Sequence, residues 1–545
     1  MNSEKNQKNS GDILLKITGL RIEAQSSDTW QEIVKGIDLE LHRGEILGLI
    51  GESGAGKSTL GLAAMAYERP GCRITGGSIV FDGTDLKKAS KEYKLGLWGS
   101  RIAYVAQSAA ASFNPAHNLI DQYIETALQH NVLSEEQARA DAVDMYRRLR
   151  LPNPEQIGFR YPHQVSGGQL QRAMTAMAMA CRPDLIIFDE PTTALDVTTQ
   201  VEVLAAIREV VEQFGTAAIY ITHDLAVVAQ MADRIMVLRH GNKVEEAETG
   251  RMLSAPQMEY TKTLWAVRSL HHQPKTFAKE TPVLKLEGVH AGYGKLPILR
   301  DISLEVPKGA TVAVVGESGS GKSTVARVLT GLLPASKGQL YFQGKELPAS
   351  YSQRSRETLR HIQMIYQMPD TALNPRQRVR DFIGRPLEFY LGLKGKARDA
   401  RIHQLLEQIE LSPAQIIDRF PGELSGGQKQ RICIARALAA EPRVIICDEV
   451  TSALDQIVAK GILQLLGRLQ ERLGLSYLFI THDIETVKGI ADQVVVMHQG
   501  VIVEQGPLAQ VFSPPHHDYT ARLLASVPQM DPEWLTRRLA QTGHV

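Results

Sequence analysis

The sequence predicts an α/β protein made of two copies of one phosphate-binding domain, each with a mainly parallel sheet and a helical insert. Short apolar runs at 46–50 and 311–315 each lead into a glycine-rich loop and then into a helix-forming segment. Such runs are typical of strands that are buried on both faces. From the second shared motif onward the two halves keep a constant spacing of 259 positions, as from Asp189 to Asp448. A period this long indicates a duplicated domain and not a solenoid.

The remaining elements alternate in the same order in both halves. Further buried strands are predicted at 185–188 and 218–221 in the first half, and at 444–447 and 477–480 in the second. In the insert, apolar residues at helical spacing predict a helix over 118–128. Ser134 and Gln137 predict a capping box, and Asn153 and Ser412 are expected to cap helices that begin with proline. The predicted boundaries are a first domain over 11–268, a polar linker over 269–281, a second domain over 282–528 and a C-terminal tail over 529–545.

Composition limits the class of protein. The chain has 545 residues, 43% hydrophobic and 22% charged, which is typical of a folded globular chain. Its net charge of +1 argues against an electrostatic grip on nucleic acid. No apolar run approaches the roughly 20 residues of a spanning helix, and the polar N-terminus lacks a signal-peptide core. The cysteines show no metal-binding or disulfide spacing, so we expect reduced thiols and no zinc at Cys72, Cys181, Cys433 and Cys447.

Each half contains a phosphate-binding loop (P-loop) of the form G-x4-G-K-S-T between a strand and a helix. Its backbone N–H groups and the helix N-terminus favour bound phosphate. Lys57 and Lys322 can reach the β- and γ-phosphates, and Ser58 and Ser323 can ligate Mg²⁺. The predicted nucleotide-binding residues are Gly51, Ser53, Gly54, Gly56, Lys57, Ser58 and Thr59 in the first half, and Gly316, Ser318, Gly319, Gly321, Lys322, Ser323 and Thr324 in the second.

Two adjacent acids end a hydrophobic strand in each half, at a fixed distance after the P-loop. Asp189 and Asp448 are predicted to hold Mg²⁺ through water. Glu190 and Glu449 are predicted to polarise the water that attacks the γ-phosphate. The pattern therefore favours an enzyme that hydrolyses a nucleoside triphosphate.

The sequence SGGQ at 166–169 and 425–428 resembles the signature of ABC-type ATPases. The order of motifs in each half also matches that family. The further matching residues are the glutamines Gln107 and Gln367, the aspartates Asp196 and Asp455, and the histidines His223 and His482. The resemblance covers nearly the whole chain.

The resemblance implies two nucleotide-binding domains that pack head to tail, with each ATP held by one P-loop and by the signature of the other domain. It implies a first site of Lys57, Ser58, Gln107, Asp189, Glu190 and His223 with Ser425, Gly427 and Gln428, and a second site of Lys322, Ser323, Gln367, Asp448, Glu449 and His482 with Ser166, Gly168 and Gln169. The two glutamates and two histidines would be catalytic, and Gln107 and Gln367 would join the serines and aspartates around Mg²⁺. Both sites have complete motifs, so both are expected to hydrolyse ATP.

One departure concerns the aromatic residue that stacks on adenine in this family. Tyr293 fits that role in the second half, whereas alignment of the two halves places Ala24 at the corresponding position in the first. Trp30 either replaces the missing aromatic residue or is simply a loop aromatic.

Two further segments resemble ATPases of oligopeptide, dipeptide and nickel importers. One runs from Gln107 to Pro115 and from Gln367 to Pro375, and the other spans 256–265 and 515–524. The fused layout resembles the ATPase of YejF-type peptide importers. The resemblance implies a peripheral protein on the cytoplasmic face of the cell membrane, with two permease subunits and an extracytoplasmic solute-binding protein as partners. It implies ATP and Mg²⁺ as cofactors and, without the C-terminal cysteines of some members, no iron–sulfur cluster.

Two other functions stay open at this point. A soluble tandem ABC translation factor would act on ribosomes, but its long charged linker contrasts with the short stretch at 269–281. A DNA-repair or exporter ATPase would need zinc modules or spanning helices, which the sequence does not show. The transported solute is not determined by these residues.

Overall fold

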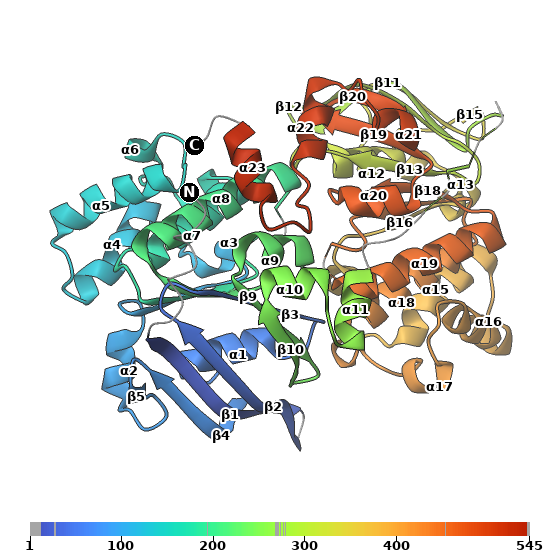
Figure 1. Ribbon diagram of the computed structural model, residues 1–545. Helices are drawn as coiled ribbons and strands as arrows, with labels where there is room; N and C mark the ends of the chain where they lie inside the picture. Colours follow the sequence, from blue (N-terminus) through green and yellow to red (C-terminus); the bar gives the residue numbers. More distant parts are fainter. Residues whose placement is uncertain are drawn as a thin grey trace. The chain divides into compact units, whose positions relative to one another are not determined.

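The computed structural model describes residues 12–26, 29–192, 195–266, 272, 274–275, 277, 280–452 and 454–541. The predicted linker at 269–281 lies largely outside these residues. The chain divides into two compact units (Figure 1). Unit 1 comprises Met1–Leu195, Thr199–Ala266 and Pro528–Val545, and unit 2 comprises Asp196–Thr198 and Val267–Val527.

Unit 1 contains two sheets. The antiparallel sheet has the order β2-β1-β4-β5, with β1 at Ile13–Ser26, β2 at Thr29–His42, β4 at Cys72–Phe81 and β5 at Thr84–Asp85. The six-stranded sheet has the order β10-β9-β3-β8-β7-β6, with β3 at Ile46–Gly51, β6 at Ile102–Val105, β7 at Leu185–Asp189, β8 at Ala217–Ile221, β9 at Arg234–Arg239 and β10 at Asn242–Glu248. Its strands pair in parallel except for the edge pair β9 and β10.

Unit 2 repeats this topology. Its antiparallel sheet has the order β12-β11-β14-β15, with β11 at Leu284–Tyr293, β12 at Leu296–Val306, β14 at Lys337–Phe342 and β15 at Lys345–Glu346. Its six-stranded sheet has the order β16-β17-β18-β13-β19-β20, with β13 at Thr311–Val315, β16 at Ile362–Ile365, β17 at Val444–Asp448, β18 at Ser476–Ile480, β19 at Gln493–His498 and β20 at Val501–Pro507. The predicted α/β duplication with mainly parallel sheets is therefore confirmed.

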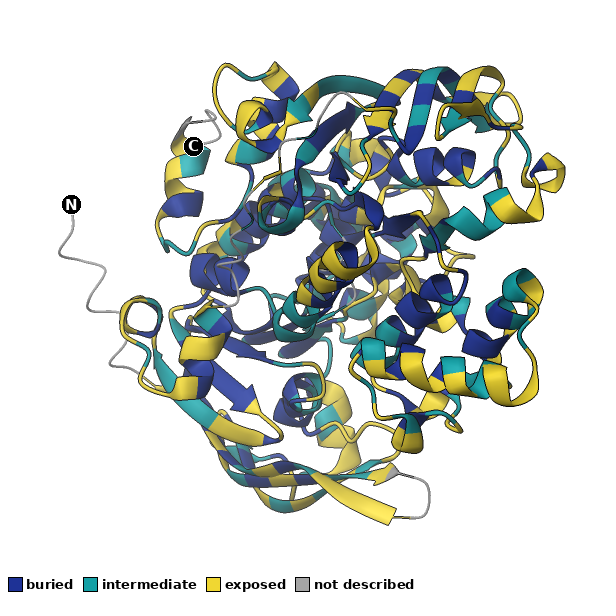
Figure 2. Cartoon of the chain, turned by 90° about the vertical axis from the view of Figure 1, so that its right-hand side faces the viewer, coloured by how far each residue is buried: buried dark blue, intermediate teal, exposed yellow. Residues whose placement is uncertain are grey.

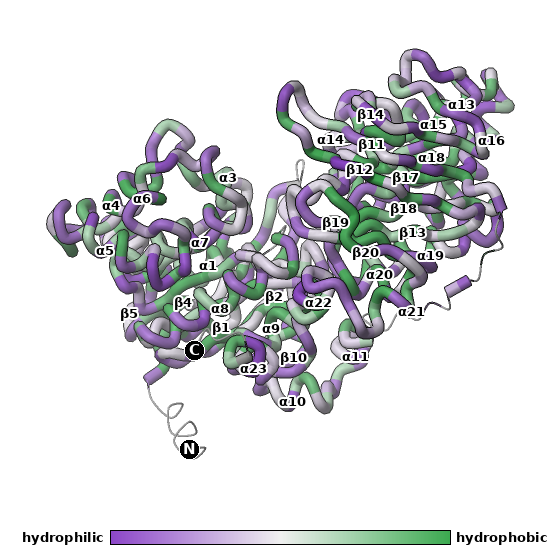
Figure 3. The backbone as a smooth tube through the Cα atoms, turned by 90° about the horizontal axis from the view of Figure 1, so that it is seen from above, coloured by the Kyte–Doolittle hydropathy of each residue, from purple (hydrophilic) through white to green (hydrophobic). Residues whose placement is uncertain are grey.

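The central strands show why apolar runs form this sheet. Every residue of β3 and β13 is buried, and the interior strands are dark blue in Figure 2. Figure 3 shows β13 and β18 in green, as expected for strands without a polar face. In contrast, β12 alternates between exposed and buried positions, because one face of the antiparallel sheet meets solvent.

Helices cover the sheets and form the inserts. In unit 1 they are α1 Lys57–Ala64, α2 Lys91–Leu97, α3 Ala109–Ser112, α4 Leu119–Gln129, α5 Glu135–Arg148, α6 Pro154–Ile157, α7 Gly167–Ala178, α8 Val197–Phe214, α9 Leu225–Met231, α10 Thr249–Ser254, α11 Glu259–Ala266 and α23 Trp534–Gln541. In unit 2 they are α12 Lys322–Leu329, α13 Arg356–His361, α14 Pro369–Ala372, α15 Val379–Leu391, α16 Gly395–Gln408, α17 Pro413–Ile416, α18 Gly426–Leu438, α19 Gln456–Leu473, α20 Ile484–Ile490, α21 Leu508–Val511 and α22 Asp518–Ala525. Among the described residues, none of these helices is long and apolar enough to cross a membrane.

The local predictions for the insert are confirmed in part. Helix α4 buries the predicted apolar stripe, and Ser134 and Gln137 form the predicted capping box of α5. The predicted caps at Asn153 and Ser412 are wrong, because neither side chain bonds to the first turn of its helix. Asn153 has a φ of 49°, in the left-handed region, whereas a capping side chain requires an extended backbone.

The last described segment of the chain packs within unit 1, where α23 lies beside α8 and α9 (Figure 1). The buried side chain of Gln230 binds three backbone groups of this segment. Its Nε2 donates to the carbonyls of Gln529 at 2.7 Å and Asp531 at 2.8 Å, and its Oε1 accepts from the N–H of Leu535 at 2.9 Å. The predicted tail at 529–545 thus forms part of the core of unit 1 as far as it is described.

We expect Leu535→Ala to destabilise unit 1 by about 2–5 kcal/mol, because Leu535 is 0% exposed and its loss leaves a cavity. Thermal unfolding of the full chain measures this as a lower first transition. Glu533→Ala is the matched control, because Glu533 is exposed and lies two positions before Leu535. Equal transitions for the two variants would contradict the docking of α23.

Candidate functional site

The P-loop of each unit connects a central strand to a helix. Gly56 and Gly321 adopt φ values of 96° and 102°, which glycine tolerates, and so allow the loop to turn directly into α1 and α12. Lys57 Nζ donates to the carbonyls of Gly51 at 2.8 Å and Glu52 at 2.9 Å. Lys322 makes the same two bonds at 2.8 Å each, and burial lowers the pKa of its ammonium group. Each lysine is therefore placed inside its loop.

A hydroxyl and a carboxylate meet beside each P-loop. Ser58 Oγ donates to Asp189 Oδ1 at 2.9 Å, and Ser323 Oγ donates to Asp448 Oδ1 at 3.0 Å. Burial raises the pKa of both aspartates. The structure thus brings together the serine and the aspartate that are predicted to hold Mg²⁺. The aspartate ends one parallel strand and the serine follows another, and the carboxyl ends of these strands lie at the same edge of the sheet.

Asp189 has a further partner in unit 1 that the sequence does not predict. Tyr104 on β6 donates its hydroxyl to Asp189 Oδ2 at 2.6 Å. Met364 occupies the corresponding position on β16, and its thioether cannot donate such a bond. No local motif identifies Tyr104, since its role depends on the pairing of β6 with β7.

The glutamate after each aspartate is held between a glutamine and a histidine. Gln107 Nε2 donates to Glu190 Oε2 at 2.9 Å, and His223 Nδ1 lies 3.1 Å from Glu190 Oε1. In unit 2, Gln367 Nε2 donates to Glu449 at 2.7 Å, and His482 Nδ1 lies 3.4 Å from the other carboxylate oxygen. Each predicted trio is therefore in contact within its own unit.

The two glutamates have an unusual backbone conformation and lie next to a histidine whose pKa is shifted. Glu190 and Glu449 each have a φ of 50°, a left-handed conformation that is unfavourable for this residue type and typical of functional sites. Burial alone would lower the pKa of His223 and His482, but the hydrogen bond and charge of the adjacent glutamate raise it. Burial would raise the pKa of Glu449, but His482 lowers it below its usual value. In unit 2 the histidine therefore favours the ionised form of Glu449.

The signature sequences begin α7 and α18. Ser166 Oγ accepts from the N–H of Gln169 at 3.3 Å, and the Gln169 side chain accepts from the N–H of Ser166 at 3.1 Å. Ser425 and Gln428 form the same capping box. The described contacts of both glutamine side chains are therefore with the helix start, whereas the signature motif predicts nucleotide binding for them.

Glycine in the signature allows a close helix contact. A Cβ atom on Gly168 would lie 2.3 Å from Cγ2 of Thr199, and one on Gly427 would lie 2.6 Å from Cγ1 of Val458. Real Cβ atoms essentially never come so close, so a larger residue at either position would force the side chain of Thr199 or Val458 to shift. The signature serines and glycines are thereby fixed at the N-termini of α7 and α18.

The expected adenine side of the two units differs. Tyr293 is 44% exposed at the end of β11, and its hydroxyl accepts from Arg327 Nη1 at 2.6 Å. Ala24 pairs with Gln31 in unit 1, and Tyr293 pairs with Leu296 in unit 2. Gln31 and Leu296 are 265 positions apart, as are the two P-loops, so the strand register supports the alignment of Ala24 with Tyr293.

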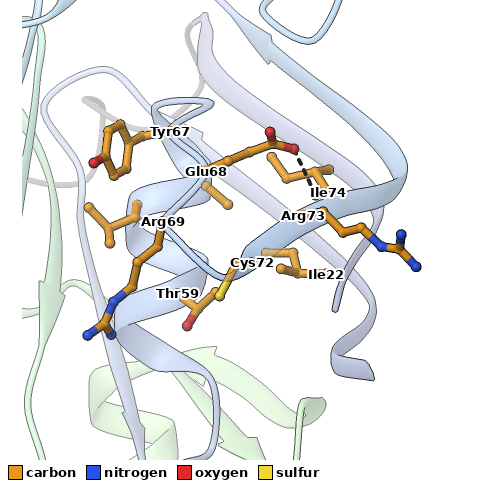
Figure 4. A pocket seen from close by; sticks show the side chains of 10 residues that line it. Ile22, Thr59, Tyr67, Glu68, Arg69, Cys72, Arg73 and Ile74 are labelled. Carbon is orange, nitrogen blue, oxygen red and sulfur yellow. Dashed lines mark hydrogen bonds between the residues drawn. The ribbon is translucent and has the colours of Figure 1, made fainter. Parts of the chain in front are cut away.

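Trp30 lies on the other face of this hairpin. It pairs with Gln25, one position beyond the pair of Ala24 and Gln31, and successive residues of a strand point to opposite faces. Its ring lies 4.1 Å from Cζ of Arg73. Figure 4 shows the Arg73 guanidinium extending away from Thr59 and Cys72, which line the pocket between the hairpin and α1. The structure therefore separates Trp30 from the face that carries Ala24.

Comparison with known proteins extends over both units. The family model described as "ABC transporter" matches residues 34–193 and 299–452, and "Oligopeptide/dipeptide transporter, C-terminal region" matches residues 503–544. The chain is 38% identical to "Glutathione import ATP-binding protein GsiA" of Salmonella typhimurium (strain LT2), with 95% of this chain and 90% of the relative covered. It is 37% identical to the protein of that name from Escherichia coli (strain K12), with the same coverage. Among solved structures, cbiO1 from Clostridium perfringens, part of the ABC transporter complex cbiONQ, is 28% identical, covers 49% of this chain and 98% of its own, and has a TM-score of 0.39.

Proposed function

Since the chain belongs to the ABC transporter family and is the ATPase subunit of a bacterial importer, we propose that it powers the uptake of a peptide or peptide-like solute. The observation that carries this proposal is the similarity along 95% of the chain to proteins named for the import of glutathione, which is a tripeptide. The C-terminal match to a region named for oligopeptide and dipeptide transporters supports the same class of solute. Both comparisons favour an importer over the alternative of a ribosomal factor.

The P-loop of each unit would hold the phosphates of ATP. Lys57 and Lys322 would exchange their bonds to loop carbonyls for stronger, charge-assisted bonds to phosphate oxygens. The adjoining Ser58–Asp189 and Ser323–Asp448 pairs offer the hard oxygen ligands that Mg²⁺ prefers, at the edge of the P-loop. Mg²⁺ there would neutralise charge on the β- and γ-phosphates.

Glu190 and Glu449 would act as general bases for the attacking water. The contacts with His223 and His482 support this role, because they fix the orientation of each carboxylate, and His482 also lowers the pKa of Glu449. Gln107 and Gln367 would connect each base to the region beside Mg²⁺. By resemblance to the family, the signature of the other unit would complete each site through the helix N-terminus that Ser425 or Ser166 caps.

A groove in unit 2 supports an association with a membrane permease. A cavity of about 480 Å³ is lined by Tyr366, which directly precedes Gln367, and by the segment that resembles peptide importers, including Ala372 and Asn374. Its rim carries exposed aromatic side chains, with Tyr351 51% and Phe389 53% exposed. Exposed apolar groups gathered around a cavity mark an interaction site. We assign this groove to a cytoplasmic helix of a permease subunit, which would place the chain on the cytoplasmic face of the membrane.

Uptake measurements test the class of solute. In cells that lack this chain, the uptake of labelled glutathione, dipeptides and longer peptides is compared with that of labelled sugars and Ni²⁺. We expect these cells to lose the uptake of at least one peptide-like solute. The wild-type chain should restore this uptake, and the double variant Lys57→Ala with Lys322→Ala should not. If peptide uptake were unchanged while the uptake of a sugar or of Ni²⁺ was lost, the proposal would be contradicted.

The two adenine pockets should differ in affinity. An aromatic stack on a base contributes about 1–3 kcal/mol, so Tyr293→Ala should weaken ATP binding at the second site by roughly tenfold. Trp30→Ala should have a smaller effect at the first site, because Trp30 lies on the opposite face from Ala24. ATP titrations in Lys57→Ala and Lys322→Ala backgrounds isolate the two sites. Equal affinities that both fall on loss of the aromatic residue would show that Trp30 stacks on adenine.

A further inference from the structure

A tyrosine from the C-terminal part of each unit reaches the P-loop of that unit. In unit 2, the N–H of Glu317 donates to the hydroxyl of Tyr519 at 2.9 Å. In unit 1, the N–H of Glu52 donates to the hydroxyl of Tyr260 at 3.4 Å. Glu52 and Glu317 are the second residues of the two P-loops, and Tyr260 and Tyr519 occupy corresponding positions 259 apart in α11 and α22. The same contact has therefore been kept in two copies that differ in much of their sequence.

Each tyrosine ring is fixed against the strand beside the P-loop strand. Tyr519 is 2% exposed and stacks on His498 with the ring centroids 4.1 Å apart. Tyr260 is 9% exposed, and Cζ of Arg239 lies 4.6 Å from its ring centroid. His498 ends β19 and Arg239 ends β9, the strands that pair in parallel with β13 and β3. The hydroxyls are thus held in place relative to the strands that lead into the P-loops.

The tyrosine and the P-loop lysine bind opposite sides of one peptide unit. The carbonyl of Gly316 accepts from Lys322 Nζ at 2.8 Å, and the N–H of Glu317, in the same peptide unit, donates to the hydroxyl of Tyr519. If Lys322 turns to a phosphate, that carbonyl loses its partner, and the bond to Tyr519 then remains to restrain the loop. Burial raises the pKa of Tyr519 to about 12, so its hydroxyl stays neutral at physiological pH. A neutral hydroxyl can accept the hydrogen bond from the N–H without placing a negative charge near the phosphates.

We propose that Tyr519 and Tyr260 are positioning residues for nucleotide binding, through which the C-terminal part of each unit sets the affinity of its P-loop for ATP. Each tyrosine would hold the N–H of the second P-loop residue, Glu317 or Glu52, while the later N–H groups of the loop bind the phosphates. The inference rests on the proposed placement of ATP at the two P-loops. It predicts an effect on ATP binding and not on the chemical step, because each hydroxyl binds the backbone of its P-loop.

The double variant Tyr519→Phe with Tyr260→Phe removes both hydroxyls and keeps both rings. We expect the KM for ATP and the Kd for a fluorescent ATP analogue to rise by about fivefold in the full chain, with kcat within about twofold of wild type. Tyr519→Phe alone should have the larger share of the effect, because its bond is shorter. Tyr477→Phe is the matched control. Its buried hydroxyl donates to the carbonyl of Leu466 at 3.0 Å, in the same unit but away from the P-loop.

A fivefold rise in Kd that Tyr477→Phe does not share would support the inference. An unchanged Kd, or a lower kcat at unchanged KM with a lower unfolding temperature, would overturn it and leave a structural role only. Lys322→Ala is measured in parallel. If that variant weakens binding while the tyrosine variants do not, the inference fails and the proposed site stands. If Lys322→Ala also leaves binding unchanged, the placement of ATP at the P-loop fails, and the inference fails with it.

Discussion

We expect the double variant Glu190→Gln with Glu449→Gln to bind ATP and to hydrolyse it about 10²–10⁴-fold more slowly than the wild-type chain. Glutamine has nearly the same shape as glutamate, and its amide oxygen can still accept from Gln107 or Gln367. What it lacks is the basic carboxylate that orients the attacking water and takes its proton. The left-handed φ of 50° at both positions would be unchanged, so the amide should occupy the place of the carboxylate.

Steady-state ATPase rates and retention of labelled ATP on a desalting column measure the two properties separately. Glu485→Gln serves as the control, because Glu485 forms an ion pair with Lys488 on α20, close in sequence to His482 but outside the site. The control should keep wild-type turnover. Ready hydrolysis by the double variant would show that another group is the base, while loss of ATP retention would show that the carboxylates are needed for binding.

The chemical core of each site could be predicted because it follows from chain order. Lys322, Ser323, Asp448 and His482 each follow a buried parallel strand, and the carboxyl ends of such strands meet at one edge of the sheet. Their contacts therefore need only the strand assignments and the motifs. The capping box of Ser134 could be predicted for a similar reason, since such a cap joins residues only three positions apart.

Other features could not be predicted because they join distant segments without a local pattern. Tyr519 reaches Glu317 across 202 positions, and Gln230 reaches Leu535 across 305. The assignment of Gln169 to nucleotide binding is a different case. The residue type fits both a ligand contact and a cap, and only the structure shows its amide at the backbone of Ser166. The asymmetry at Tyr104 likewise depends on which strand lies beside β7.

Each P-loop lysine should be needed for transport, so that Lys57→Ala or Lys322→Ala alone removes most of the transport-coupled ATP hydrolysis. Each ammonium group would make charge-assisted bonds to phosphate, worth roughly 1.5–3 kcal/mol apiece. Both lysines are only 6% exposed, so truncation to alanine removes a buried ammonium group and leaves a space in its place. In the proposed arrangement each ATP also binds the signature of the other unit, and closure therefore requires both sites to be loaded.

The two sites are not identical, so the two lysine variants could differ in their effect. Unit 1 has Tyr104 on Asp189 but Ala24 at the adenine position, whereas unit 2 has Tyr293 but Met364. ATPase activity and solute uptake are measured for each single variant in the complex with the permease, with Lys488→Ala, an exposed lysine of α20, as the control. If one lysine variant kept wild-type turnover and uptake, its site would be regulatory, and the differences at the adenine and aspartate positions would then indicate which unit has given up hydrolysis.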